Sequence, residues 1–298
     1  TGGSTANTLI GVVVTGNAAT AAQGTWQWNN AGTWTTISTS LTDATGLFLT
    51  SATSVRFLPA ANFNGTPGAL TVRLVDSSIA APTNGSLQNV SANGGTTAYS
   101  AATVTLGTIV TAVNDAPVAS GSATLAAVNE DTASPPGATV SSLVAGNFSD
   151  AADQVTGGST ANTLIGVVVT GNAATAAQGT WQWNNAGTWT TISTLLSDAT
   201  GLFLTSATSV RFLPAANFNG PPGSLTVRLV DSSIAAPTNG SLQNVSANGG
   251  TTAYSAATVA LGTSITAVND APVATGAATL AAVNEDSTPP GATVSSLF

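Results

Sequence analysis

The chain has 298 residues, a formal net charge of −8 at pH 7 and a pI near 4.1. It contains no Cys, Met, His or Lys, so the thiolate and imidazole ligands of zinc, copper and haem sites are missing. The clustered cations that bind nucleic acid are missing too, and no apolar run approaches the roughly 18 residues of a membrane span. We therefore expect no nucleic-acid partner and no membrane insertion by this segment.

A long tandem repeat dominates the sequence. Residues 1–116 recur as residues 156–271 at an offset of 155, and the two copies differ at only seven positions, which are 40, 42, 66, 69, 105, 109 and 110. A period of this length fits one whole β domain per repeat better than a helical solenoid. We expect an incomplete β-sandwich repeat lacking its first strand at 1–116, a complete one at 117–271, and the opening strand segment of the next repeat at 272–298.

Short β-type runs bounded by Gly, Pro, Asn or Asp follow one another along the complete repeat, and no helical periodicity is sustained. The pattern predicts an all-β fold of tandem Ig-like or cadherin-like β-sandwich repeats. The expected strands are 122–128, 164–170, 179–183, 188–192, 201–205, 209–213 and 225–231, with a last strand region at 251–268. The turn formers from Asn184 to Gly187 predict a hairpin, and the polar stretch 232–248 predicts a surface loop.

Three Trp residues recur in both copies of the repeat, as Trp26, Trp28 and Trp34 and then as Trp181, Trp183 and Trp189. One interpretation is an aromatic platform for sugar rings, which would make the repeat a carbohydrate-binding module with surface glycans as partners. The favoured interpretation is core packing, because buried aromatic side chains dominate the cores of such domains.

Three sequence blocks occur in the same order in each copy: RFLPAANFNG at 56–65, LTVRLVD at 70–76 and VTAVNDAPV at 110–118, with NED at 129–131. Together they resemble the cadherin-like tandem repeats of giant bacterial surface proteins, including RTX-type adhesins. The resemblance implies an extracellular module at the bacterial cell surface or in a secreted matrix, strung head to tail. It also implies calcium at many junctions and a role as a stalk or in cell adhesion and biofilm formation.

The scarce carboxylates are unevenly placed. Of the seven in residues 117–271, four fall within 130–153. Grouped anions repel one another unless a cation is present, and Ca²⁺ accepts about six to eight oxygens from carboxylates, Asn side chains and main-chain carbonyls. We therefore predict bound Ca²⁺, with the candidate ligands Asn114, Asp115, Glu130, Asp131, Asp150, Asp153, Asp231, Asp270, Glu285 and Asp286. The alternative is that these acids mark solvated loop ends and fix turns.

Enzymatic activity is not expected. Without His or Lys, no ordinary base is present to activate a Ser or Thr hydroxyl. A glycosidase-like carboxylate pair would be the remaining route, but Glu130 and Asp131 are adjacent and would point to opposite faces of a strand.

A counterpart of the expected first strand 122–128 lies at 277–283, beyond the complete repeat. Donation of this strand to the incomplete repeat of another copy would build an open head-to-tail filament. Three hypotheses therefore stand: a structural or adhesive extracellular repeat stiffened by calcium, a self-assembling fibre subunit, and a carbohydrate-binding module. The expected partners are neighbouring repeats or copies of the chain itself.

Overall fold

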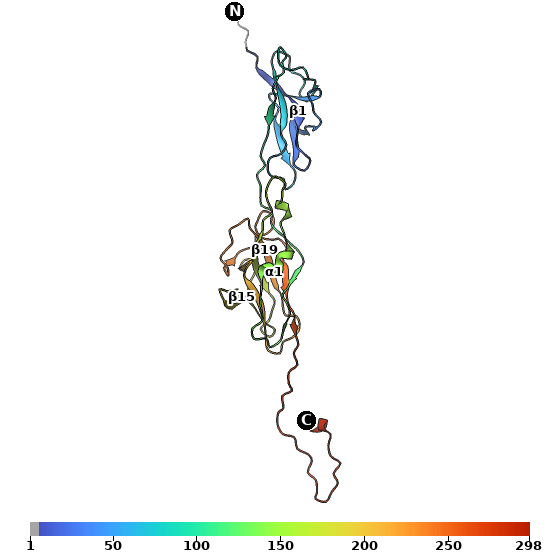
Figure 1. The fold of residues 1–298 in the computed structure, drawn as a ribbon, viewed down its shortest axis with the longest axis vertical. Helices are drawn as coiled ribbons and strands as arrows, with labels where there is room; N and C mark the ends of the chain where they lie inside the picture. The colour runs from blue at the N-terminus through green and yellow to red at the C-terminus, as the bar shows by residue number, and fades with distance from the viewer. Residues whose placement is uncertain (1–5) are drawn as a thin grey trace, which may run out of the picture.

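The computed structural model describes residues 6–298, which form two β-sandwich domains joined end to end and a long extended segment (Figure 1). Domain 1 contains the strands β1 to β8, and domain 2 contains β9 to β22 together with the short helix α1. The prediction of an all-β sandwich fold is confirmed.

Domain 1 consists of two antiparallel sheets. The larger has the order β7-β4-β1-β6-β8, and the smaller has the order β3-β2-β5. Their strands are β1 (Leu9–Asn17), β2 (Gly24–Asn30), β3 (Thr33–Thr36), β4 (Gly46–Thr50), β5 (Val55–Pro59), β6 (Leu70–Asp76), β7 (Leu87–Gln88) and β8 (Val104–Leu106). The strands β8 and β5 are sheet edges among the residues that the structure describes.

Domain 2 repeats this arrangement from β14 onward. The repeated strands are β14 (Leu164–Asn172), β15 (Gly179–Asn185), β16 (Thr188–Thr191), β17 (Gly201–Thr205), β18 (Ser209–Pro214), β19 (Leu225–Asp231), β20 (Leu242–Gln243) and β21 (Val259–Gly262), followed by β22 (Ile265–Thr266).

Residues 117–153, here called the opening segment, precede these strands. They contain β9 (Val118–Ala119), β10 (Ser122–Thr124), β11 (Val128–Asn129), β12 (Ala138–Thr139), α1 (Val140–Val144) and β13 (Phe148–Ser149), with 3₁₀ turns at Ala145–Asn147 and Ala151–Asp153. The opening segment adds β10 to the larger sheet and β12 to the smaller one. Their strand orders become β10-β21-β19-β14-β17-β20 and β12-β18-β15-β16. The opening segment also forms the small pairs β11-β22 and β13-β9.

Several expected elements have different bounds in the structure. The strand expected at 122–128 is divided into β10 and β11, because its parallel partners β21 and β22 are themselves separated at residues 263–264. The predicted hairpin forms between β15 and β16, but its loop has only two residues, Ala186 and Gly187. Their φ values of 50° and 95° are both positive, which is typical of the tight turn that suits twisted strands. The predicted loop 232–248 contains the short strand β20.

Most of the Trp residues fill the two cores. Trp181 and Trp183 point to the same face of β15 and are buried, as are their counterparts Trp26 and Trp28 in β2. Trp181 also donates a hydrogen bond through Nε1 to the carbonyl of Gly223, at 2.8 Å. The core-packing interpretation is therefore confirmed for these four. Trp34 and Trp189 are half-buried, and each ring is covered by an Arg guanidinium, at 4.1 and 4.2 Å from the ring centroid.

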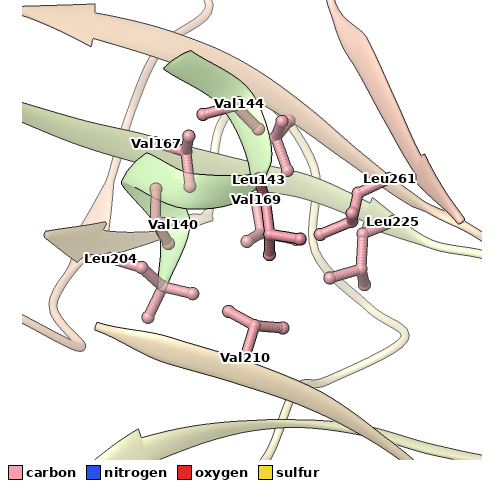
Figure 2. Close-up of a pocket in the computed structure, with 10 residues that line it drawn as sticks. Val140, Leu143, Val144, Val167, Val169, Leu204, Val210, Leu225 and Leu261 are labelled. Atoms are coloured by element: carbon pink, nitrogen blue, oxygen red, sulfur yellow. The ribbon is translucent and has the colours of Figure 1, made fainter. Parts of the chain in front are cut away.

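The helix α1 covers the open side of the core of domain 2. The Thr139 hydroxyl caps its N-terminus by accepting a hydrogen bond from the Ser142 amide. Its apolar side chains Val140, Leu143 and Val144 then face the sheet residues Val167, Val169, Leu204, Val210, Leu225 and Leu261 (Figure 2). A helix of this length is too short to be stable alone, so packing on the sheet holds it in place.

In each domain a buried Arg of the larger sheet forms an ion pair with a half-buried Asp of a loop. Arg228 on β19 binds both carboxylate oxygens of Asp198, at 2.9 and 2.8 Å, and also donates to the carbonyls of Ser255 and Ala256. Arg73 and Asp43 repeat this arrangement in domain 1.

The hydrogen bonds from Arg228 hold the pKa of the Asp198 carboxyl below its ordinary value, with burial opposing them. A carboxyl with a lowered pKa adds stability above its unfolded pKa of about 4, and that stability is lost as the pH falls through the folded value.

We predict that Asp198→Asn lowers the stability of domain 2 at pH 7 by about 1–2 kcal/mol, because Arg228 loses its charged partner. The variant should also lose less stability than the wild type between about pH 4 and pH 2. Urea unfolding at each pH measures both effects, with Asp270→Asn, at an exposed position, as the control. Identical acid dependence of Asp198→Asn and the wild type would contradict this account.

Candidate cation site at the domain junction

Two contacts fix the junction between the domains. In the first, the buried Asn64 side chain in domain 1 accepts from the Ser159 amide at 2.7 Å and donates to the Ser159 hydroxyl at 2.9 Å. In the second, the linker after domain 1 binds a loop of domain 2: Ala116 N donates to Gly250 O at 2.7 Å, and Asn114 Nδ2 donates to Thr252 O at 3.1 Å. The chain therefore crosses the junction once but is held there at two places.

Three buried carboxylates lie behind these contacts, and we call Asp150, Asp153 and Asp231 the junction carboxylates. Asp150 directly follows β13, Asp153 ends the second 3₁₀ turn, and Asp231 is the last residue of β19. Their exposed fractions are 5%, 5% and 0%. The opening segment thus brings two acids to the end of the strand that carries the third.

Asn162, just before β14, connects the group. Its main-chain N–H donates to Asp150 Oδ2, and its side-chain amide donates to Asp153 Oδ2 at 2.9 Å and to Asn114 Oδ1 at 2.8 Å. Asp153 Oδ1 accepts from the Asp115 amide at 3.1 Å, so both oxygens of Asp153 have partners. Asp231 Oδ1 accepts from the amide and the hydroxyl of Ser233.

Two buried carboxylate oxygens, Asp150 Oδ1 and Asp231 Oδ2, have no hydrogen-bond partner. The chain has only four cationic side chains, all Arg, and within residues 6–298 the salt bridges that they form are those with Asp43 and Asp198. The junction carboxylates are therefore not neutralised by a basic side chain. A buried carboxylate without a partner is costly, so this group favours either a proton or a bound cation.

The electrostatics of Asp150 reflect this shortage of partners. Burial raises the pKa of its carboxyl above the ordinary value, the hydrogen bond from the Asn162 amide opposes that effect, and the Asp153 and Asp231 charges raise the pKa further. A cation held beside Asp150 would relieve both the burial of the charge and the repulsion.

The donor atoms fit a hard cation. Carboxylate, amide and main-chain oxygens are the ligands that Ca²⁺ prefers. In the described part of the chain, no three acidic side chains lie close enough together to hold one metal ion. An ion here would take its two free carboxylate oxygens from Asp150 and Asp231, and neutral oxygens would supply the rest of its ligands.

Most of the other predicted ligands lie elsewhere. Glu130 accepts from Val268 N and from Asn219 Nδ2, and Asp131 accepts from Asn217 N, so both lie where the chain leaves domain 2. The expectation that Glu130 and Asp131 form one group with Asp150 is wrong, because the chain crosses domain 2 between them. Asp270, Glu285 and Asp286 are exposed in the extended segment. Asn114 and Asp115 do lie at the junction, the latter through its main chain.

Sequence reasoning missed Asn64, Ser159 and Asn162. Asn162 has a counterpart in domain 1, Asn7, and Asp231 has a half-buried counterpart there, Asp76. In both copies an Asn stands just before the first repeated strand and an Asp stands at the end of β6 or β19. This recurrence in the sequence could have pointed to the site.

The fold and the junction define a tandem β-sandwich protein with a buried acidic group between its domains. No family model matches the chain, and no curated protein matches it. The cadherin-like family suggested by the sequence blocks is therefore not shown. Among solved structures, the CupB6 tip adhesin of Pseudomonas aeruginosa is similar at 9% sequence identity and a TM-score of 0.25, over 89% of this chain and 87% of that chain. A likeness of this size supports no statement about function. In residues 6–298, no helix is long and apolar enough to cross a membrane.

The contact between Asn64 and the Gly158–Ser159 turn can be tested by a single methyl group. A Cβ at residue 158 would lie 2.4 Å from Asn64 Oδ1, so we predict that Gly158→Ala separates the two domains and widens the range of interdomain angles. Small-angle X-ray scattering measures this range. Gly146→Ala is the control, because a Cβ there meets no atom within 4 Å. Unchanged scattering for Gly158→Ala would contradict the proposed role of this contact.

Proposed function

We propose that this chain is an extracellular structural module of tandem β-sandwich domains whose junction is stiffened by Ca²⁺, and that it extends or joins cells or matrix without catalysing a reaction. The observation that carries the proposal is the pair of buried, unpartnered carboxylate oxygens of Asp150 and Asp231 beside the domain junction. No Arg neutralises them, and Ca²⁺ supplies the missing charge with ligands of the right chemistry.

A cation at this place would act on the angle between the domains. The junction carboxylates and Asn162 hold the two ends of the turn at residues 154–161, and this turn presents Ser159 to Asn64 of domain 1. Ser159 Oγ also donates to the main-chain carbonyl of Asp153. Fixing Asp150 to Asp231 would therefore fix the base of the turn that touches domain 1. The stiffening follows from this chain of contacts.

The placement outside the cell rests on the sequence. A chain free of Cys and Met lacks the two side chains whose sulfur is readily oxidised. The end-to-end stacking of the two domains suits a module that spans distance (Figure 1). Adhesion, biofilm formation and a bacterial surface come from the resemblance of the sequence blocks and remain part of the proposal.

A calcium titration of the 298-residue chain tests the proposal. Binding to the folded state alone should stabilise it by about 2.7 kcal/mol when free Ca²⁺ is 100 times the Kd. This corresponds to a rise of roughly 5–10 °C in the melting temperature of domain 2. Small-angle scattering of the same samples should show a narrower range of interdomain angles with Ca²⁺ than with a chelator.

Asp150→Asn identifies the site. The amide removes the buried charge but keeps an acceptor for Asn162, so the variant should melt above the wild type in chelator and lose the response to Ca²⁺. Asp131→Asn is the matched control, because it removes one charge at the other end of domain 2, and Asn also tolerates the positive φ of 64° there. A wild-type chain that does not respond to Ca²⁺ would overturn the proposal and leave a protonated Asp150 as the neutralised form.

A further inference from the structure

Six Asn residues in the sequence are followed by one residue other than Pro and then by Ser or Thr, which is the acceptor pattern for N-linked sugar. They are Asn64, Asn84, Asn89, Asn147, Asn239 and Asn244. Some such matches arise by chance in a chain rich in Asn, Ser and Thr. The structure separates the six, because a folded domain can carry a bulky sugar only on an amide that faces solvent.

Two of the six have amide nitrogens that are used inside the fold. Asn64 is buried at the domain junction, where its Nδ2 donates to the Ser159 hydroxyl. Asn147 Nδ2 donates to the carbonyls of Ser120 and Ser122, at 2.6 and 3.3 Å. A sugar on either nitrogen would break these contacts.

Asn84 and its counterpart Asn239 are half-buried in a packed turn. The Oδ1 atom of each accepts a main-chain hydrogen bond from β4 or β17, at 3.0 Å. The Gly that follows Asn84 lies so close to Trp28 that a Cβ on it would be 2.5 Å from the indole ring. This turn therefore leaves little room for a sugar beside the amide.

Asn89 and Asn244 differ from the other four, because both are exposed. The Oδ1 atom of each accepts from the main-chain N–H of the Ser two residues on, Ser91 or Ser246, at 3.1 and 3.0 Å. Within residues 6–298, neither Nδ2 donates a hydrogen bond to another part of the protein. This turn holds a free amide beside the exposed Ser that completes the acceptor pattern.

The residue between the Asn and the Ser anchors the turn. Val90 and Val245 are 0% exposed, and their N–H groups donate to the carbonyls of Asp43 and Asp198 at 2.6 Å. The Val side chain therefore enters the core, while the Asn before it and the Ser after it are exposed. Both domains have this geometry, so it is a property of the repeat itself.

The exposed Asn directly follows an edge strand. β7 and β20 are the outermost strands at one side of the larger sheets in the described part of the chain, and they end one residue before Asn89 and Asn244. Leu87 and Leu242 on these strands are both 63% exposed. Unpaired main-chain groups beside an exposed Leu favour pairing with another chain. A hydrated sugar next to the strand would obstruct that pairing.

We propose that Asn89 and Asn244 are N-glycosylated and that their sugars cover the edge strands β7 and β20. A transferase of the producing cell joins Nδ2 to the anomeric carbon of a sugar that is activated on a phosphate. The bond between that carbon and the phosphate oxygen breaks, the phosphate leaves with the electron pair, and the amide loses one proton to a base of the transferase. This inference does not depend on calcium and goes beyond the proposed function.

Mass spectrometry of the protein isolated from the cells that produce it tests the modification. Cleavage at Arg separates the two copies, because Asn89 falls in the fragment 74–211 and Asn244 in the fragment that starts at residue 229. A second protease then gives peptides short enough to assign a sugar to one residue. We expect sugar on Asn89 and Asn244 and none on Asn147 or Asn239.

Substitutions at Ser246, made in the same cells, provide matched controls. Ser246→Ala removes the hydroxyl that the acceptor pattern requires, so the sugar on Asn244 should be lost and the sugar on Asn89 kept. Ser246→Thr should keep both sugars, and Ser241→Ala, in the half-buried pattern, should change neither. The modification is overturned if Asn89 and Asn244 carry no sugar in the isolated protein, or if Ser246→Ala keeps the sugar on Asn244.

Sedimentation tests the covering of the edge strands. The double variant Ser91→Ala/Ser246→Ala should self-associate at concentrations at which the glycosylated wild type is monomeric. Adding Leu87→Lys and Leu242→Lys to the double variant should abolish the association, because each edge then carries a charge. Equal sedimentation of the double variant and the wild type would overturn the covering role.

Discussion

The sandwich of domain 2 depends on a segment that covers the edges of both its sheets. An edge strand presents unpaired N–H and C=O groups and, here, apolar side chains that need a partner. In domain 2 the opening segment supplies that partner to both sheets at once, through β10 on β21 and β12 on β18. The core then closes under α1, and the largest hydrophobic cluster of the described residues forms in this domain.

The same covering builds the junction. After α1 the chain returns along β13, which pairs with β9, and this return places Asp150 and Asp153 beside Asp231 at the end of β19. In domain 1, where no such segment is described, the counterpart Asp76 is only half-buried. The acidic group is therefore buried in the domain that has its opening segment. A cation bound there would depend on that segment and would also affect the interdomain angle.

Sequence reasoning succeeded where the signal was local. The alternation of Leu225, Val227 and Leu229 predicted β19 with its observed bounds, and the turn formers predicted the hairpin that places Trp181 and Trp183 in the core. It failed where distant segments meet, as in the division of 122–128 into two strands by their partners β21 and β22. Sequence proximity likewise suggested one group for Asp131 and Asp150, although β12 and α1 lie between them and carry the chain across the domain.

Amide hydrogen exchange of β8 and β21 within one chain is the most direct test of the central claim, that the opening segment completes the domain it precedes. The two strands differ only at residue 105, which is Ala260 in β21, and this difference lets mass spectrometry separate their peptides. At a concentration where the chain is monomeric and calcium is chelated, the account predicts much slower exchange in β21 than in β8. Equal exchange in the two strands would contradict it.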